Sequence, residues 1–299
     1  MHSGMALLAD DISRTGLLQE CRAALRQAGV DHSEWEAWWI IQAVLEVDRA
    51  TFMSSTDGPV PSEQTARIRA LIQRRAGREP LQYVLGTQEF CGLDMAVSPA
   101  VLIPRPETEG LVEQACRVMS NATDGLLVEV GTGSGCISVA LATRLPYTRI
   151  FAIDLSNDAL AVATANAVRC GVAGRIQFLV GDLLTPLPAL EDVVGKVDVV
   201  VSNPPYIQNS EIADLQPEVR WEPRLALAGG VDGLGIIRRL IAESGAVLRP
   251  LGWLMMEVGQ GQANVVSAFA RAQGDWAHVE VVQDGAGIDR ILCLQRKGK

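Results

Sequence analysis

The chain has 299 residues, of which 48% are hydrophobic and 20% charged, with a formal net charge of −9; this composition is globular, and the length favours one large domain with a smaller one. The acidic balance disfavours a nucleic-acid-binding face, and the scattered cysteines and few histidines lack metal-ligand spacing, so we expect no direct nucleic-acid partner and no metal. No run approaches the roughly 18 apolar residues that a membrane span needs.

The first residues lack a basic segment ahead of their short apolar run, and Asp10 and Asp11 follow that run. A secretory leader is therefore not expected. We expect a cytoplasmic monomer that makes no membrane contact and whose cysteines stay reduced.

Apolar residues at helical spacing, such as Leu17, Cys21 and Leu25, predict a small all-α domain over residues 1–82. The domain is interrupted near its middle by a segment rich in glycine and proline, which separates two helical regions.

Two side-chain clusters in this domain allow two interpretations each. Trp35, Trp38 and Trp39 favour core packing over a recognition surface, because positions three and four apart share a helix face. The arginines between residues 67 and 78 favour a solvated helix face over a phosphate-binding or partner-binding patch.

Residues 83–104 contain short apolar stretches broken by glycine and proline, which predicts a hairpin-like linker. Over residues 105–299 strand and helix patterns alternate, as in a mostly parallel sheet covered on both faces. The last two predicted strands are expected to pair antiparallel at one edge. The segments that predict strands are 126–130, 149–154, 176–181, 197–202, 252–258, 278–284 and 290–296.

The stretch "VEVGTGSGCISVALA" follows the first of these strands and opens a helix. A glycine loop at a helix N-terminus is where a parallel sheet presents a nucleotide. The spacing here is GxGxG, because Cys136 stands where the dinucleotide fingerprint needs its third glycine. Glycines also form tight turns without any ligand, so the loop alone is weak evidence.

Acidic residues end the next two predicted strands. Asp154 lies 23 residues after Gly131, near the offset at which a carboxylate accepts hydrogen bonds from ribose hydroxyls. Asp182 could accept from the exocyclic amine of an adenine, although either acid could instead be a helix cap or a turn former. A glycine loop without dinucleotide spacing, followed by two such acids, matches S-adenosylmethionine, a nucleoside joined to an amino acid.

The stretch "VVVSNPPYIQ" takes a fourth buried strand directly into Asn203, Pro204, Pro205 and Tyr206. The prolines hold Asn203 extended at the strand end and donate no backbone hydrogen bond. A planar amine or amide would meet the Asn203 side-chain oxygen and the Pro204 carbonyl as acceptors, with the Tyr206 ring to stack upon. The alternative interpretation is a rigid turn whose tyrosine packs in the core.

An amide nitrogen is a poor nucleophile because its lone pair is delocalised into the carbonyl group. Two acceptors that hold its hydrogens would orient it and stabilise the positive charge that develops as it attacks a sulfonium methyl group in line. No strong base is needed beforehand, since the proton can leave after the transfer.

The NPPY tetrapeptide, "GTGSG" and the strand-end acids together resemble amino-methyltransferases that modify exocyclic or amide nitrogens. The segments "REPLQYVLGTQEFCGLDMAVSPAVLIPRPETEGLVE", "VRWEPRLALAGGVDGLGIIRRLI" and "DGAGIDRIL" are similar to the release factor glutamine methyltransferases, the HemK-like family. The resemblance covers residues 78–296. It implies a seven-stranded, mostly parallel class I (Rossmann-like) methyltransferase sheet with a helical N-terminal domain that helps engage the protein substrate.

The resemblance also implies methylation, from S-adenosylmethionine, of the side-chain amide nitrogen N5 of the glutamine in the Gly-Gly-Gln motif of class 1 peptide chain release factors. Arg105 and Glu107 are candidate supporting residues, and Leu183 stands where family members often carry an aromatic residue. The implied cofactor contacts are Glu129, Gly131, Thr132, Gly133, Ser134, Gly135, Asp154, Asp182, Leu183 and Asn203. The implied substrate contacts are Asn203, Pro204, Pro205 and Tyr206, with Asn203, Pro204 and Tyr206 as the catalytic candidates.

Other functions stay open at this point. A paralogue could use the same chemistry on another protein, a peptide or the nitrogen of a secondary metabolite. A DNA adenine methyltransferase would need a target-recognition region and a basic surface, which the chain does not offer. A non-catalytic binding protein of the same fold would have no reason to keep the loop, both acids and the tetrapeptide intact.

Overall fold

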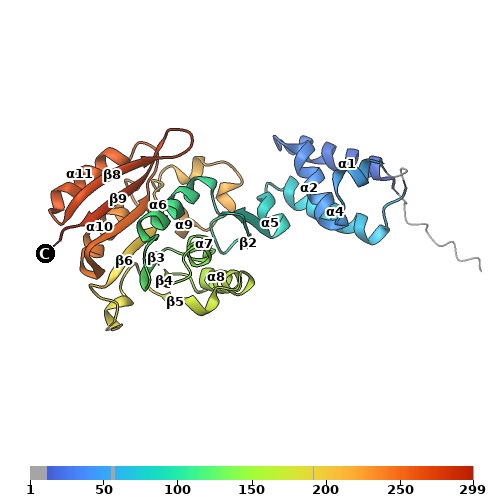
Figure 1. Ribbon diagram of the computed structural model, residues 1–299. Coiled ribbons are helices and arrows are strands. Elements are labelled where there is room, and N and C mark those ends of the chain that lie inside the picture. The colour runs from blue at the N-terminus through green and yellow to red at the C-terminus, as the bar shows by residue number, and fades with distance from the viewer. Residues whose placement is uncertain (1–11, 55–57, 191, 299) are drawn as a thin grey trace, which may run out of the picture. The chain divides into compact units, whose positions relative to one another are not determined.

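The computed structural model describes residues 12–54, 58–190 and 192–298 (Figure 1). The chain divides into a helical unit, Met1–Gly86 with Pro217–Trp221, and a sheet unit, Thr87–Gln216 with Glu222–Lys299. No secretory leader is expected at the N-terminus, and residues 1–11 lie outside the described residues. None of the described helices combines the length and apolar character that a membrane crossing requires.

The helical unit is built around a core of aliphatic side chains. Ser13 caps its first helix by accepting a hydrogen bond from the Gly16 amide at 3.1 Å. Leu17, Leu25 and Ile40 are fully buried, as the helical spacing predicts. The helices are α1 (Arg14–Gln27), α2 (Ser33–Leu45), α3 (Arg49–Ser54), α4 (Ser62–Ala76) and α5 (Leu81–Leu85), and a 3₁₀ turn covers Val219–Trp221.

The three tryptophans of α2 do not all pack in this core. Trp38 is 5% exposed and meets the Phe52 ring edge-on, but Trp35 and Trp39 are 50% and 45% exposed. The buried face of α2 is formed by residues such as Ala37, Ile41 and Val44, and at about 100° per residue Trp35 and Trp39 point away from this face. The core-packing interpretation is confirmed for Trp38 and is wrong for the other two.

The arginines of α4 are not simply a solvated face. Arg75 is 5% exposed; it forms an ion pair with Glu36 and donates from Nη1 to Glu218 at 2.9 Å. Arg78 donates from Nε to the same Glu218 carboxylate at 2.7 Å. The solvated-face interpretation is wrong at Arg75, because its partner Glu218 stands 143 positions later in the chain and no local pattern reveals it.

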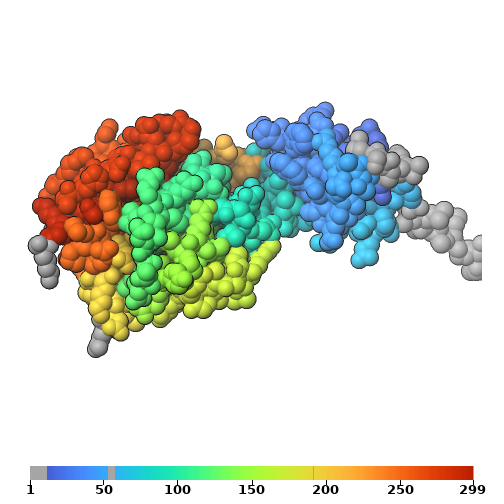
Figure 2. Space-filling view, viewed as in Figure 1, coloured from blue at the N-terminus to red at the C-terminus, as the bar shows by residue number. Residues whose placement is uncertain are grey.

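The sheet unit contains a seven-stranded sheet in the order β5-β4-β3-β6-β7-β9-β8. The strands from β5 to β7 are parallel, and β9 pairs antiparallel with both β7 and β8. The expected edge pair is thereby confirmed. The residues of this edge pair, red in Figure 2, lie together on one side of the sheet unit. The strands are β3 (Gly125–Val130), β4 (Thr148–Asp154), β5 (Ile176–Val180), β6 (Val197–Ser202), β7 (Leu248–Glu257), β8 (Trp276–Gln283) and β9 (Asp289–Arg296).

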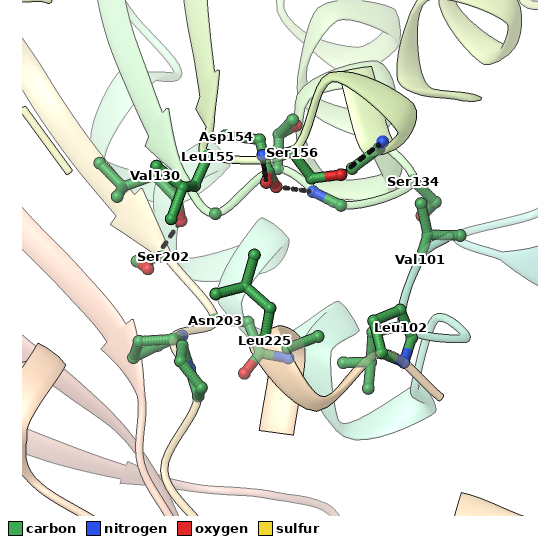
Figure 3. A pocket seen from close by; sticks show the side chains of 18 of the residues that line it. Val101, Leu102, Val130, Ser134, Asp154, Leu155, Ser156, Ser202, Asn203 and Leu225 are labelled. Carbon is green, nitrogen blue, oxygen red and sulfur yellow. Dashed lines mark hydrogen bonds between the residues drawn. The ribbon is translucent and has the colours of Figure 1, made fainter. Parts of the chain in front are cut away.

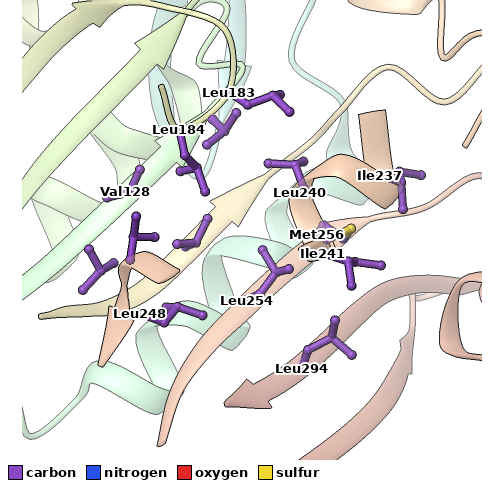
Figure 4. Close-up of a cluster of buried hydrophobic side chains, with 14 of the residues drawn as sticks. Val128, Leu183, Leu184, Ile237, Leu240, Ile241, Leu248, Leu254, Met256 and Leu294 are labelled. Carbon is purple, nitrogen blue, oxygen red and sulfur yellow. The ribbon is translucent and has the colours of Figure 1, made fainter. Parts of the chain in front are cut away.

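Two hydrophobic clusters cover the two faces of the sheet, so its central strands are buried on both sides. One face packs on α10 through residues such as Ile237 and Leu240 (Figure 4) and on α11 through Val266. The other packs mainly on α6 and α7 and also meets the hairpin of β1 and β2. These elements are α6 (Glu109–Met119), α7 (Cys136–Arg144), α8 (Asn157–Arg169), α9 (Arg224–Leu227), α10 (Gly235–Val247), α11 (Ala263–Gln273), β1 (Thr87–Phe90) and β2 (Leu93–Ala96).

The chain runs outward from β3 through β4 to β5 on one side and from β6 to β7 on the other. The strand order therefore reverses between β3 and β6. In open α/β sheets ligands bind at such a switch point, outside the carboxyl ends of the strands. A ligand site is therefore expected among the residues that follow β3, β4, β5 and β6.

We predict that Arg75→Met destabilises the helical unit by about 2 kcal/mol, because the partly buried carboxylate of Glu36 loses its ion pair and Glu218 keeps only Arg78. Amide hydrogen exchange in α2 and α4 measures this loss. The exposed Arg67→Met on the same helix is the control and should change exchange by less than about 0.5 kcal/mol. Equal exchange in the two variants would contradict a stabilising role for the ion pairs.

Candidate active site

A cavity of about 400 Å³ opens at the carboxyl ends of β3 to β6, entirely within the sheet unit (Figure 3). Asp154 and Ser156 lie on one side of it, with Asn203 and Leu225 opposite. Gly135 and Tyr206 are predicted site residues that do not line it. The predicted residues that do are Glu129, Gly131, Thr132, Gly133, Ser134, Asp154, Asp182, Leu183, Asn203, Pro204 and Pro205.

The glycine loop turns from β3 into α7 with a backbone that side chains disfavour. Gly131, Gly133 and Gly135 all have positive φ, at 72°, 53° and 77°. A Cβ on Gly135 would lie 2.9 Å from the Cβ of Ala163 in α8. Gly135 therefore lets two helices approach closely, which explains a loop glycine that is absent from the cavity wall.

Asp154 is held in place by the backbone that surrounds it. Its Oδ2 accepts from the Gly133 amide at 2.8 Å and its Oδ1 from the Ser156 amide at 2.9 Å, as the dashed lines in Figure 3 mark. The bond from the Ser156 amide gives Asp154 the turn-forming role that was the alternative interpretation of this residue. A carboxylate has about four acceptor positions, so Asp154 still has capacity for a pair of hydroxyl donors from the cavity.

Asp182 faces both the cavity and a cation that sequence reasoning missed. Arg239 of α10 donates to its Oδ1 at 3.1 Å and its Oδ2 at 2.9 Å. Both side chains are about half exposed, and the carboxylate keeps lone pairs for a further donor. Leu183, the next residue, is 8% exposed and offers an aliphatic contact to the cavity.

Glu129, near the end of β3, is fully buried and only half satisfied. Its Oε2 accepts from the Thr132 hydroxyl at 2.6 Å, the Ser138 amide at 3.1 Å and the Ser138 hydroxyl. Its Oε1 is buried and has no hydrogen-bond partner among the described residues. Burial raises the pKa of Glu129 to about 7. An unpaired carboxylate oxygen in the wall of a cavity fits a ligand that brings a positive charge or strong donors.

The tetrapeptide after β6 is fixed by contacts from several elements. The Ser202 hydroxyl donates to the Val130 carbonyl at 2.8 Å, which ties the ends of β6 and β3 together. The Gln262 side chain donates to the Tyr206 carbonyl at 2.9 Å. The Tyr206 ring is partly buried against the core, which matches the packed-tyrosine alternative, and its hydroxyl donates to Glu257 at 3.2 Å.

A second wall of the cavity is joined by an ion pair. Arg105 contacts Glu222, and the Ile103 amide donates to the same carboxylate at 3.1 Å. Arg105 lines the cavity, whereas Glu107 is exposed and does not. The contact holds residues 103–105 against Glu222, so Arg105 supports the shape of this wall.

Sequence reasoning missed Thr108, Glu222, Arg239 and Glu257. Glu257 carried a usable signal, because it is an acid at the end of an apolar parallel strand, as Asp154 is. The other three have partners far away in the chain and gave no local signal.

Family models match both units of the chain. The PrmC N-terminal domain matches residues 16–86, and the Methyltransferase small domain matches residues 113–218. The release factor glutamine methyltransferase of Geobacter sulfurreducens is 43% identical over 277 residues, which cover 92% of this chain and 94% of that protein. The release factor glutamine methyltransferase of Nitratidesulfovibrio vulgaris is 42% identical, with 94% of each chain covered. The chain belongs to the release factor glutamine methyltransferase family.

The expected class I methyltransferase fold with a helical N-terminal domain is confirmed. The hMettl16 catalytic domain, solved in complex with the MAT2A 3'UTR hairpin 1, matches with a TM-score of 0.58 at 16% identity. That match covers 82% of this chain and 85% of the other. At this identity the likeness concerns the fold alone.

We predict that Glu129→Gln stabilises the free protein at pH 8. The pKa of Glu129 is raised from 4.5 to about 7, so between these values the folded state holds more protons than the unfolded state. Stability therefore falls as pH rises through this window, by about 3 kcal/mol, and glutamine should remove the fall. Urea unfolding at pH 5 and pH 8 measures it.

The same variant should weaken binding of a ligand that carries an ammonium group, because the amide replaces the unpaired oxygen. Calorimetric titration with S-adenosylhomocysteine, whose amino acid end carries such a group, should show an affinity loss of at least about tenfold at pH 8. The exposed Glu113→Gln is the control for both measurements. Unchanged affinity in Glu129→Gln would show that the carboxylate does not contact the ligand.

Proposed function

We propose that this protein transfers the methyl group of S-adenosylmethionine to N5 of the glutamine in the Gly-Gly-Gln motif of class 1 peptide chain release factors. The observation that carries the proposal is the position of the Asn203 amide at a cavity that the glycine loop, Asp154 and Glu129 also line. Membership of the release factor glutamine methyltransferase family supports the reaction and the substrate class.

The residues of the cavity fit the cofactor. S-adenosylmethionine, when bound, supplies an electrophilic methyl group on a sulfonium sulfur. Asp154 would accept from the ribose hydroxyls, and Asp182 with Leu183 would flank the adenine. The buried, unpaired Oε1 of Glu129 would receive the ammonium group of the amino acid end.

Asn203 and the Pro204 carbonyl would hold the substrate amide through its two hydrogens. Asn203 Oδ1 and the Pro204 carbonyl oxygen are both acceptors, so they favour an amide nitrogen over a carboxylate oxygen at this place. Holding both hydrogens would orient the nitrogen toward the methyl group and stabilise the charge that develops during the attack. The nitrogen loses its extra proton after the new N–C bond has formed, so the site needs no strong base.

A paralogous activity on another protein is the alternative. The likeness to hMettl16 does not favour a nucleic-acid substrate, because it concerns the fold alone. The net charge of −9 also disfavours broad contact with a phosphate backbone.

We predict that the protein, incubated with methyl-labelled S-adenosylmethionine and a class 1 release factor, labels the Gly-Gly-Gln glutamine. A release factor with Gln→Ala at this position should stay unlabelled, and Asn203→Ala should label the normal factor at least about 100-fold more slowly. Peptide mass spectrometry locates the label. Labelling of the altered factor, or of another protein alone, would favour the paralogous activity.

A further inference from the structure

We propose that Glu257, acting through Thr108, is a positioning residue that turns the Asn203 side-chain amide so that its oxygen faces the substrate. The inference rests on the proposed function, since it explains how Asn203 comes to present an acceptor. An asparagine side chain has two nearly isosteric ends, one accepting and one donating, and only one of them suits the hydrogens of an amide substrate.

A chain of hydrogen bonds leads from Asn203 into the protein. Its Nδ2 donates to Thr108 Oγ1 at 3.0 Å, and Thr108 Oγ1 donates to Glu257 Oε2 at 2.6 Å. Both inner members are 2% exposed. No donor among the described residues binds Asn203 Oδ1, and Asn203 lines the cavity.

The direction of these bonds follows from the chemistry of their ends. Both oxygens of Glu257 accept a hydroxyl proton, one from Tyr206 and one from Thr108, so the single proton of the Thr108 hydroxyl is committed to Glu257. Toward Asn203 the hydroxyl can then only accept, which requires the NH₂ end of the amide on that side. The oxygen end is left for the cavity.

The same carboxylate also holds the far end of the tetrapeptide. The Tyr206 hydroxyl donates to Glu257 Oε1 at 3.2 Å, and burial raises the pKa of that hydroxyl, which keeps it a donor. Glu257 therefore binds both Asn203, through Thr108, and Tyr206 directly. This gives Tyr206 a role in the turn although its ring does not line the cavity.

Burying the Glu257 carboxylate costs free energy, and this cost is useful only if the carboxylate sets the direction of the hydrogen bonds around it. Glu257 lies at the end of β7, and burial is the main cause that raises its pKa. Arg290, whose positive charge opposes this rise in pKa, forms an ion pair with Asp284 at 3.3 Å. A well-packed apolar residue is often as stable as a buried charge, so stability alone gives no reason for an acid here.

Glutamine at position 257 would remove the fixed direction of these hydrogen bonds, because its amide has one accepting and one donating end. Where its NH₂ group faces Thr108, the hydroxyl proton of Thr108 is free to donate toward Asn203. The Asn203 amide then turns to accept that proton and presents its NH₂ end to the cavity. Valine at position 108 would remove the hydroxyl with little change of shape and leave the amide without a set direction.

Steady-state methylation of a release factor by the intact protein tests the proposal. Thr108→Val and Glu257→Gln should lower kcat by about 10- to 100-fold, while the Kd for S-adenosylhomocysteine stays within about twofold. Thr108→Ser keeps the hydroxyl and should remain within about threefold of the wild type. The control is Thr143→Val, whose hydroxyl donates to the Val139 carbonyl of its own helix and has no other partner among the described residues.

A second measurement is the ratio of the affinities for glutamine and glutamate substrates, because a structural defect would not change this ratio. The wild type should bind a release factor with the normal glutamine more tightly than one with Gln→Glu, because a carboxylate offers no hydrogen to Asn203. Glu257→Gln should reduce this ratio by about tenfold or more, since the turned amide donates to the carboxylate. A general loss of packing would weaken both factors alike.

The outcomes separate the inference from the proposed function. No methylation by the wild type would overturn the proposed function. With an active wild type, the inference is overturned if Thr108→Val and Glu257→Gln keep normal kcat, if Thr108→Ser is as slow as Thr108→Val, or if the glutamine-to-glutamate ratio does not change. If Thr108→Val does not fold, Glu257→Gln and Thr108→Ser carry the same test.

Discussion

The adjacency of β3 and β6 at the centre of the sheet is the constraint on which the site depends. Both strands are parallel, so the glycine loop after β3 and the tetrapeptide after β6 leave the sheet at the same edge. The bond from the Ser202 hydroxyl to the Val130 carbonyl holds these two ends together. A cofactor on the β3 side and a substrate on the β6 side would therefore meet without any loop having to move far.

Two buried carboxylates flank this edge and have different tasks. Glu129 has one buried oxygen without a hydrogen-bond partner among the described residues, which destabilises the free protein. A ligand with an ammonium group would remove this free-energy penalty. Glu257 has hydrogen bonds on both oxygens, so its effect is to set the direction of its neighbours. In both residues, burying the charge costs free energy, and only a function at the cavity explains why a charged residue is present.

The fold followed from local patterns, because buried parallel strands and amphipathic helices have periods that a sequence shows directly. All seven strands were predicted, and the main difference is β7, which begins at Leu248 although the pattern predicted residue 252. Pro250 interrupts the strand pattern over the missed residues 248–251, because proline is uncommon inside a sheet. The strand-end residues that line the cavity were also predictable, since the carboxyl edge of a parallel sheet brings them together.

Residues that act through distant partners were not predictable. Thr108 meets Glu257 149 positions later, Arg105 meets Glu222 117 positions later, and neither pair leaves a mark in its own neighbourhood. The exposure of Trp35 likewise depends on which helices cover α2, and spacing within α2 cannot show it. Local patterns therefore predicted which residues form the edge of the cavity but did not predict what holds them there.

The most direct test of the account is a crystal structure with S-adenosylhomocysteine and a Gly-Gly-Gln peptide. We expect the glutamine amide to lie within hydrogen-bond distance, about 2.7–3.2 Å, of both Asn203 Oδ1 and the Pro204 carbonyl, with the cofactor's ammonium group at Glu129. A glutamine amide bound away from Asn203, or a cofactor that does not reach Glu129, would contradict it.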